Sequence, residues 1–401
     1  MRLINTLTAA VMAVVTLIAC QKENREASFQ KDLKEQAETE AKAGIEDLSS
    51  PGTESNNHNG SNRGYVYTLS NQTAGNMVLV YRRAANGSLT YTASYAAGGN
   101  GTGGGLGNQG AVTISNDNEV LFAVNPGSNS ISSFKITGSG LNRKSTVSSG
   151  GATPVSITQH GNLVYVLNAG GSGNISGFWL DENDKLIAIP NSTRPLSSSA
   201  SGAAQISFVR NGRVLVITEK ATNKIITYTV TQWDRPGTMH SLTSASPTPF
   251  GFAPGRFGNI YVSEAVGGAA NASNVSSYRI GFDGSISLTQ GPVATGQSAA
   301  CWVVLTENGR NIYTTNTASN TLSSYDVYPN SGNINLLQSI AATSGMGPID
   351  AALTDNSKYL YILNSGGHSI SVYAVSNTGG LASLPITITG LPVGTNGLAA
   401  N

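Results

Sequence analysis

The chain of 401 residues has a formal net charge of +1, and only 11% of its residues are charged. It therefore has no basic field to attract nucleic acid and no acidic field to attract cationic partners. Its 47 glycines, together with many Ser, Thr and Asn residues, favour short strands joined by tight turns, because glycine adopts the positive φ angles that such turns require. We expect an all-β protein without a nucleic-acid partner.

Residues 1–19 have the features of an export signal. Arg2 supplies the positive start, and the apolar run AAVMAVVTLIA that follows is too short for a comfortable membrane span. The tetrapeptide LIAC, which ends at Cys20, resembles a bacterial lipobox, in which the cysteine is acylated and becomes the new N-terminus. This resemblance implies a lipoprotein of the cell envelope, anchored to a bacterial membrane through Cys20 and facing the periplasm or the surface. The alternative is an ordinary secretory signal with an incidental cysteine.

The segment from Cys20 to residue 64 changes in composition, with the run KDLKEQAETEAKAGIEDL followed by a polar tract. Such a segment buries too little apolar surface to offset chain entropy, so we interpret it as a tether. Cys301 is the only other cysteine, so no disulfide framework is available. Stability must therefore come from packing.

From Tyr65 onward the chain repeats itself. Apolar runs such as VLFAVN, VYVLN and LYILN end in a polar residue, and these ends lie 43 to 52 residues apart. A second run ending in an aromatic residue follows each of them, as in SISSF and KIITY. Including the first copy there are seven repeats of about 48 residues, enough for four strands each. The sequence predicts a seven-bladed β-propeller over residues 65–401.

Closure of the ring can be predicted from the two ends of the repeat region. The first copy begins one strand late, and the C-terminal stretch VGTNGLAA matches the openings of other repeats, such as SGAAQISF. We expect this stretch to supply the inner strand of the first blade, because closure removes open sheet edges.

Residues 65–401 resemble a known family. Stretches such as GTGGGLGNQGA, VYVLNAGGSGNISGF, VLVITEKATNKIITY and TGQSAACWVV are similar to the lactonase-like propellers, described as 6-phosphogluconolactonase-like or carboxymuconate-cyclase-like. The resemblance implies the seven-bladed fold and a lactone-opening activity. The muconate-cyclising relatives use a histidine, arginines and a glutamate, and the inner strands TPVSITQ and AAQISFV contain no histidine. We therefore do not transfer that mechanism to this chain.

Two repeats end the first run in glutamate, Glu219 and Glu264, where others have asparagine. Because the two blades are neighbours, both carboxylates would lie on one face, and their proximity would raise the pKa of one of them. Such a pair would provide a general base, a cation site or hydrogen bonds to sugar hydroxyls. Alternatively, each glutamate accepts hydrogen bonds from its own loop or pairs with Lys220 or Lys224. The other repeats end this run in asparagine, which favours a structural role in turns, with channel or ligand binding as the alternative. These residues are Asn125, Asn168, Asn316 and Asn364.

Weaker candidates lie elsewhere in the repeats. His240 and Arg194 fall in expected loops on the same face, where they would polarise a carbonyl or bind an anion. Asp350 is the only carboxylate in an expected inner strand, where it is either a buried hydrogen-bonded group or a channel ligand. Cys301 opens an inner strand and lacks an identifiable histidine partner, which favours packing. We interpret the glycine-rich segment 96–111 as a flexible loop rather than a phosphate loop, because no Lys-Ser/Thr pair follows it.

Two functions remain open. In the first, the protein hydrolyses a lactone or related sugar-derived ring, with Glu219 or Glu264 activating water and Arg194, His240 or backbone amides stabilising the oxyanion. In the second, it is a non-catalytic, lipid-anchored propeller that binds a carbohydrate or protein. We expect a monomer with no cofactor and no metal, because cysteine and histidine are too sparse for a zinc or haem site.

Overall fold

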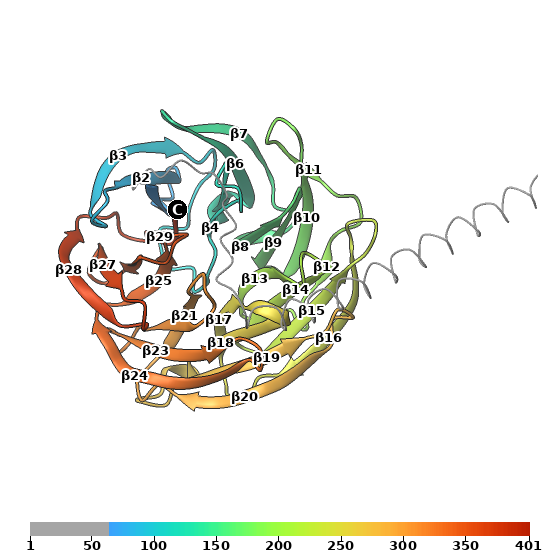
Figure 1. Cartoon of the computed structure of the whole chain (residues 1–401). Coiled ribbons are helices and arrows are strands. Elements are labelled where there is room, and N and C mark those ends of the chain that lie inside the picture. The colour runs from blue at the N-terminus through green and yellow to red at the C-terminus, as the bar shows by residue number, and fades with distance from the viewer. Residues whose placement is uncertain (1–63) are drawn as a thin grey trace, which may run out of the picture. The chain divides into compact units, whose positions relative to one another are not determined.

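The structure is a computed structural model that describes residues 64–401. These residues form seven antiparallel sheets of four strands, one of which carries an additional short strand, arranged as blades around a central channel (Figure 1). The predicted seven-bladed β-propeller is confirmed. The predicted signal peptide and Cys20 lie outside the described residues, as does the tether except for Gly64, where the first strand begins.

Blades 1 to 7 are numbered here in chain order, and the strands of each blade run from the channel outward. The innermost strands of blades 1 to 7 are β29 (Asn396–Ala400), β4 (Val112–Ile114), β8 (Ala152–His160), β13 (Ala203–Val209), β17 (Pro249–Pro254), β21 (Ala300–Leu305) and β25 (Pro348–Leu353). The second strands are β1 (Gly64–Leu69), β5 (Val120–Asn125), β9 (Leu163–Gly170), β14 (Val214–Glu219), β18 (Asn259–Glu264), β22 (Asn311–Asn316) and β26 (Tyr359–Asn364).

The third and fourth strands complete each blade. The third strands are β2 (Met77–Arg83), β6 (Ser130–Thr137), β10 (Asn174–Leu180), β15 (Lys224–Val230), β19 (Asn274–Ile280), β23 (Thr321–Tyr328) and β27 (Ser369–Val375). The outer strands are β3 (Leu89–Ala96), β7 (Gly140–Ser148), β11 (Leu186–Ala188), β16 (Pro236–Thr243), β20 (Ile286–Ala294), β24 (Asn333–Thr343) and β28 (Leu381–Ile388), with the short β12 (Arg194–Pro195) beside β10. Three 3-10 turns occur in connections, at η1 (Pro126–Ser128), η2 (Arg256–Gly258) and η3 (Val266–Gly268).

The C-terminal strand closes the ring, as predicted. Strand β29 pairs antiparallel with β1 and lies inside it, so that blade 1 is built from both ends of the described chain. The hydroxyl of Thr68 donates to the carbonyl of Gly397 at 2.6 Å, and the backbone N–H of Tyr65 donates to Oδ1 of Asn401 at 2.7 Å. Closure pairs an edge that would otherwise be exposed.

The core lies between the blades. The second strands are almost wholly buried, because both of their faces pack against neighbouring blades. Buried tyrosines also join adjacent blades by hydrogen bonds: Tyr361 of blade 7 donates to Gly87 of blade 1 at 2.9 Å, and Tyr373 donates to Thr343 of blade 6 at 2.6 Å. Each tyrosine thus buries its ring and satisfies its hydroxyl at the same time.

Strand direction gives the ring two distinct faces. Because neighbouring strands in a blade are antiparallel, the connections between blades lie on the face where the inner strands begin and the second strands end. We call this the loop face. The opposite face carries the turns between the first and second strands, and we call it the turn face.

Candidate functional site

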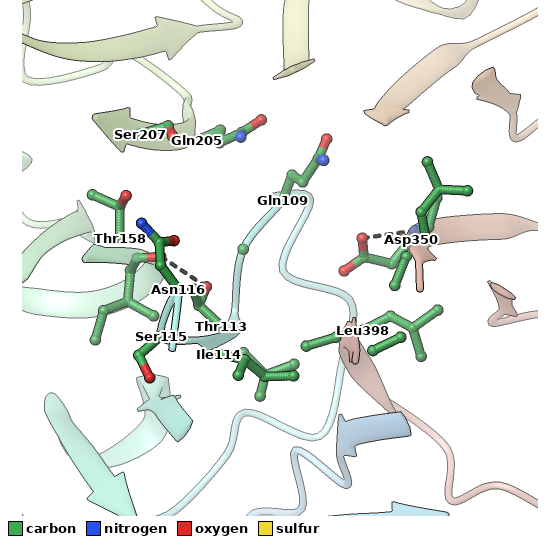
Figure 2. Close-up of a pocket in the computed structure, with 18 of the residues that line it drawn as sticks. Gln109, Thr113, Ile114, Ser115, Asn116, Thr158, Gln205, Ser207, Asp350 and Leu398 are labelled. Carbon is green, nitrogen blue, oxygen red and sulfur yellow. Dashed lines mark hydrogen bonds between the residues drawn. The ribbon is translucent and has the colours of Figure 1, made fainter. Parts of the chain in front are cut away.

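The glycine-rich segment 97–111 crosses the channel at the loop face. The backbone N–H of Gln109 donates to Ala204 of blade 4 at 3.1 Å, and the Gln109 side chain exchanges two hydrogen bonds with the backbone of Val303 in blade 6. The indole N–H of Trp302 donates to the carbonyl of Asn108 at 2.7 Å. Figure 2 shows Gln109 at the tip of this segment, between the inner strands. The expectation of a flexible loop is therefore wrong: the segment is a plug, hydrogen-bonded across the ring.

Close backbone packing explains part of the glycine content of the plug. A Cβ atom on Gly101 would lie 2.1 Å from the carbonyl carbon of Asn71, so only glycine fits at this position. On the blade 4 side, the ammonium group of Lys220 donates to the carbonyl of Gly107 and lies 4.6 Å from the centre of the Phe250 ring. Burial lowers the pKa of Lys220 to about 8. Lys220 thus holds the plug on its outer side rather than contributing to the cavity below it.

A cavity of about 510 Å³ lies in the channel beneath the plug and reaches the turn face. Its volume suits a small monocyclic ligand. The lining combines apolar residues such as Ile157 and Leu398 with polar side chains contributed by several blades. The polar lining side chains that Figure 2 labels are Gln109, Thr113, Ser115, Asn116, Thr158, Gln205, Ser207 and Asp350.

Asp350 is the buried carboxyl group of this cavity. Only 2% of the residue is exposed, and Oδ1 accepts the backbone N–H of Ala351 at 2.8 Å. Oδ2 has no hydrogen-bond partner among the residues that the structure describes. Burial raises the pKa of Asp350 well above its ordinary value, and the nearby backbone N–H groups of Ala351 and Leu398 act in the opposite direction. A buried carboxyl oxygen without a partner is costly, and a ligand in the cavity would satisfy it.

Thr158 lies on the opposite side of the cavity from Asp350 in Figure 2. Its hydroxyl oxygen accepts the backbone N–H of Phe208 at 3.3 Å, while its proton has no acceptor within residues 64–401. Two other polar side chains are already engaged, because the Gln205 amide exchanges hydrogen bonds with the backbone of Phe252 and the Thr113 hydroxyl donates to Ile157 at 3.0 Å. Asp350 and Thr158 therefore keep hydrogen-bonding capacity for a ligand, as does the exposed Asn116.

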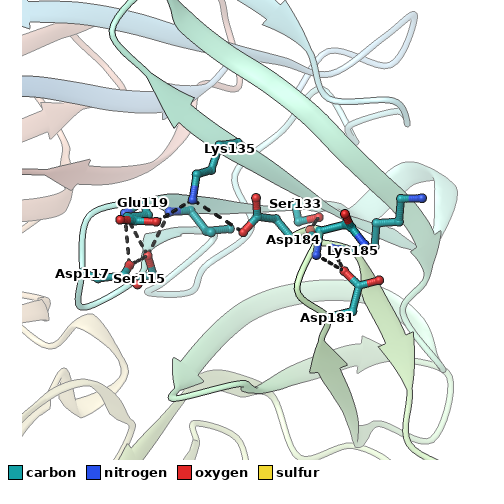
Figure 3. Close-up of polar contacts among 10 residues, drawn as sticks. Ser115, Asp117, Glu119, Ser133, Lys135, Asp181, Asp184 and Lys185 are labelled. Carbon is teal, nitrogen blue, oxygen red and sulfur yellow. Dashed lines mark hydrogen bonds and ion pairs between the residues drawn. The ribbon is translucent and has the colours of Figure 1, made fainter.

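The rim of the cavity on the turn face is held by hydrogen bonds. The Ser115 hydroxyl accepts the N–H of Val120 at 2.9 Å and donates to Asp117, which orders the turn between β4 and β5. Lys135 fixes Glu119, the last residue before β5, through an ion pair of 2.5 Å and reaches Asp184 of blade 3 at 3.8 Å (Figure 3). The rim turn is thus tied to its own blade and to the next one.

Glu219 and Glu264 end β14 and β18 at the loop face, where the sequence predicts them, and both are fully buried. The Glu219 carboxylate accepts the N–H of Ser197 at 2.8 Å and the hydroxyls of Ser197 and Thr222. Thr222 lies in the turn that follows Glu219, as in the alternative of bonding within its own loop, whereas Ser197 lies in the connection from blade 3 to blade 4.

The Glu264 carboxylate accepts hydrogen bonds from Ser244, Ser246, Ser276 and Tyr278. Burial raises its pKa, and these hydrogen bonds oppose the rise. Neither glutamate is among the residues lining the Asp350 cavity. Their predicted catalytic role stays a prediction.

The other predicted candidates also lie away from this cavity. His240 lies within the outer strand β16 opposite Thr227, and not in a loop as expected. Arg194 lies in the short strand β12 and donates to the carbonyls of Asn191 and Thr193 at 3.0 and 2.8 Å. Neither residue lines the cavity, and their predicted roles remain untested.

The four asparagines are buried, three at the last position of a second strand and Asn168 two residues before the end of β9. Their side-chain amides donate hydrogen bonds to neighbouring groups. Examples are the bonds from Asn316 to Ser323 at 2.8 Å and from Asn364 to Ser371 at 2.9 Å. Equivalent side-chain donors are Asn125 and Asn168. These bonds fit the structural alternative, while a ligand-binding role stays a prediction.

Cys301 is buried in β21, and burial raises the pKa of its thiol to about 12, so the reactive thiolate is disfavoured. Within residues 64–401 no group of three or more His, Cys, Asp or Glu side chains could bind a metal ion. The same residues include no helix long and apolar enough to cross a membrane.

The fold agrees with comparisons to known proteins. A sequence profile of the lactonase family of seven-bladed β-propellers matches residues 58–192 and 284–391, more than half of the chain. The chain belongs to this lactonase family. The resemblance proposed from the sequence is thereby confirmed at the level of the family.

Solved structures similar to this lactonase-family chain share its fold at low identity. A proposed 6-phosphogluconolactonase of Bacteroides uniformis is 19% identical with a TM-score of 0.67, and the match covers 84% of this chain and 99% of the other. A periplasmic gluconolactonase of Pseudomonas aeruginosa is 16% identical with a TM-score of 0.65, and the match covers 83% and 98%. No curated protein sequence matches the chain significantly. At these identities the structural comparisons establish the fold alone.

Proposed function

We propose that this propeller hydrolyses a small lactone in the channel cavity, with Asp350 as the residue that activates water. The observation that carries the proposal is the buried Asp350 carboxyl, whose Oδ2 lacks a partner and borders a cavity of ligand size. Membership of the lactonase family and similarity to a gluconolactonase support a lactone as the substrate class. Perturbed carboxyl groups in cavities are frequent at active sites.

The proposed chemistry uses Asp350 and Thr158, which both line the cavity. In its ionised form Asp350 accepts a proton from water as the water oxygen bonds to the lactone carbonyl carbon. Thr158 donates a hydrogen bond to an oxygen of the substrate. The ring C–O bond then breaks, the ring oxygen takes the proton from Asp350, and an open-chain hydroxy acid results. Because the pKa of Asp350 is raised, its carboxylate is a stronger base than that of an ordinary aspartate, and the rate should increase as pH rises.

The test is a comparison of Asp350→Asn with wild type on a panel of sugar lactones, in which acid release is measured by titration at constant pH. Loss of a general base typically costs a factor of about 100 to 10,000 in rate, so we expect kcat to fall at least 100-fold. Thr158→Val should lower activity less, because it removes one hydrogen bond and preserves shape. Wild-type activity in Asp350→Asn would refute the assignment.

The site predicted from the sequence provides the matched comparison. Glu219→Gln and Glu264→Gln keep the size of the side chain and test whether the loop-face glutamates contribute to catalysis. If activity depends on these residues in folded protein and not on Asp350, then the active site lies on the loop face. Binding of a sugar without turnover would instead favour the alternative of a non-catalytic carbohydrate-binding propeller.

The location of the protein is also a proposal. The LIAC motif supports a lipoprotein of the cell envelope with the lipid on Cys20. The residues between Cys20 and β1 would then serve as the tether between the membrane and the propeller. A lactonase so placed would act on lactones outside the cytoplasm.

A further inference from the structure

The charge of the cavity limits what it can bind. Its lining includes two carboxylic acids, Asp350 beneath the plug and Asp355 at the rim, and no Lys, Arg or His. Lys220 is the cation bound to the plug, but it donates to the carbonyls of Gly107 and Ala203 and does not line the cavity. Lys358 lies in the same turn as Asp355 and is also absent from the lining.

Asp355 is held at the mouth of the cavity. It is exposed on the turn between β25 and β26, and its Oδ2 accepts the side-chain amide of Asn118 at 2.7 Å. Asn118 belongs to the turn between β4 and β5, so the bond joins the rim of blade 7 to the rim of blade 2. Both residues line the cavity. A fixed negative charge therefore stands at the entrance.

We propose that the cavity selects uncharged, polyhydroxylated lactones over phosphorylated ones, and that Asp355 is a specificity-determining residue in this choice. The proposal rests on the proposed function and names the substrate class of the same site. Thr158, Ser207 and Asn116 supply polar groups suited to sugar hydroxyls. A phosphate group in the cavity would find none of the cationic side chains that normally bind it.

Two electrostatic effects act against a phosphorylated substrate. Asp355 repels the phosphate at the entrance, and the strength of this repulsion depends on ionic strength. A phosphate inside the cavity would also make ionisation of Asp350 more difficult, because like charges disfavour each other at short range. The charge of the phosphate thus weakens both the binding of the substrate and the activation of water by Asp350.

The experiment compares kcat/KM for a neutral aldonolactone and for its 6-phosphate in wild type, Asp355→Asn and the control Glu182→Gln. The control removes one exposed negative charge from the turn between β10 and β11, away from the cavity lining. We expect wild type to prefer the neutral lactone at least tenfold. Asp355→Asn should raise kcat/KM for the phosphorylated lactone three- to tenfold while changing that for the neutral lactone less than twofold. Glu182→Gln should leave both values unchanged.

A preference of the wild type for the phosphorylated lactone, or an unchanged ratio in Asp355→Asn, would overturn the inference. Calorimetric binding of the corresponding lactams, which resist hydrolysis, separates this outcome from failure of the proposed function. If neither lactone is hydrolysed but the neutral lactam binds at least tenfold more tightly than its phosphate, the proposed function fails and the selectivity stands. If neither lactam binds, both are wrong.

Discussion

Replacing Glu264 by asparagine, the residue found at this position in other blades, should destabilise the propeller. The carboxylate accepts hydrogen bonds from the hydroxyls of Ser244, Ser276 and Tyr278 at 2.5, 2.7 and 2.8 Å, and from the N–H of Ser246 at 3.1 Å. Asparagine is one methylene shorter and uncharged, so it cannot reach all four donors. A hydrogen bond to a charged group contributes about 1.5–3 kcal/mol, and losing one or two, with partial relaxation, should cost about 3 kcal/mol.

The expected shift in melting temperature follows from the size of the propeller. Unfolding entropy of about 2.1 cal/mol/K per residue gives roughly 0.7 kcal/mol/K for the residues from 64 to 401. A loss of about 3 kcal/mol therefore lowers the melting temperature by about 4 °C. Calorimetry and chemical denaturation measure both quantities, and Ser276→Ala, which removes a single donor, serves as a milder control. A melting temperature of Glu264→Asn within 1 °C of wild type would show that the hydrogen-bond network does not anchor the loop.

Four further predictions concern other parts of the chain. Deleting residues 392–401 removes β29, exposes the edge of β1 and should lower the unfolding free energy by at least about 5 kcal/mol, whereas an unchanged denaturation midpoint would contradict ring closure. Lys220→Met should speed amide hydrogen exchange in the plug 97–111, and unchanged exchange would show that Lys220 does not hold it. Burial raises the pKa of Asp350, so the folded protein keeps this proton at pH values where the unfolded chain has lost it. The unfolding free energy of wild type should therefore fall relative to that of Asp350→Asn as pH rises above 3.8, the ordinary pKa of aspartate. A difference between the two proteins that does not change with pH would refute this. Cys20→Ser should abolish acylation and move the protein to the aqueous phase on detergent extraction, and retention in the membrane would refute the anchor.

The fold could be predicted because each repeat carries the same local pattern. Five of the seven second strands end in Asn or Glu, third strands place an aromatic residue in the core, and the surplus strand within VGTNGLAA at the C-terminus completes blade 1. These features depend on strand periodicity and turn chemistry, which neighbouring residues determine. Ring closure then follows from the number of strands, because an unpaired inner position must be filled.

The site was harder to predict, because it depends on contacts between distant blades. Gln109 bonds Val303, nearly two hundred positions along the chain, and the glycines around it give no sign that the segment crosses the channel. Asp350 could be selected as the only inner-strand carboxylate, and its position in the cavity agrees with the channel alternative, but its partnerless oxygen is visible only in the assembled ring. Glu219 and Glu264 break the repeat, and their hydrogen bonds account for their conformation: Glu219 accepts from Ser197 in the connection from blade 3, and Glu264 accepts from Ser276 in its own blade.

The most direct test of the account is the location of a bound lactone analogue. A crystal structure of the complex with a neutral aldonolactam should show the ring in the channel cavity, with its carbonyl group between Asp350 and Thr158 and at least one polar atom within about 3.2 Å of Oδ2 of Asp350. Electron density for the lactam on the loop face beside Glu219 or Glu264, with the channel cavity unoccupied, would contradict it.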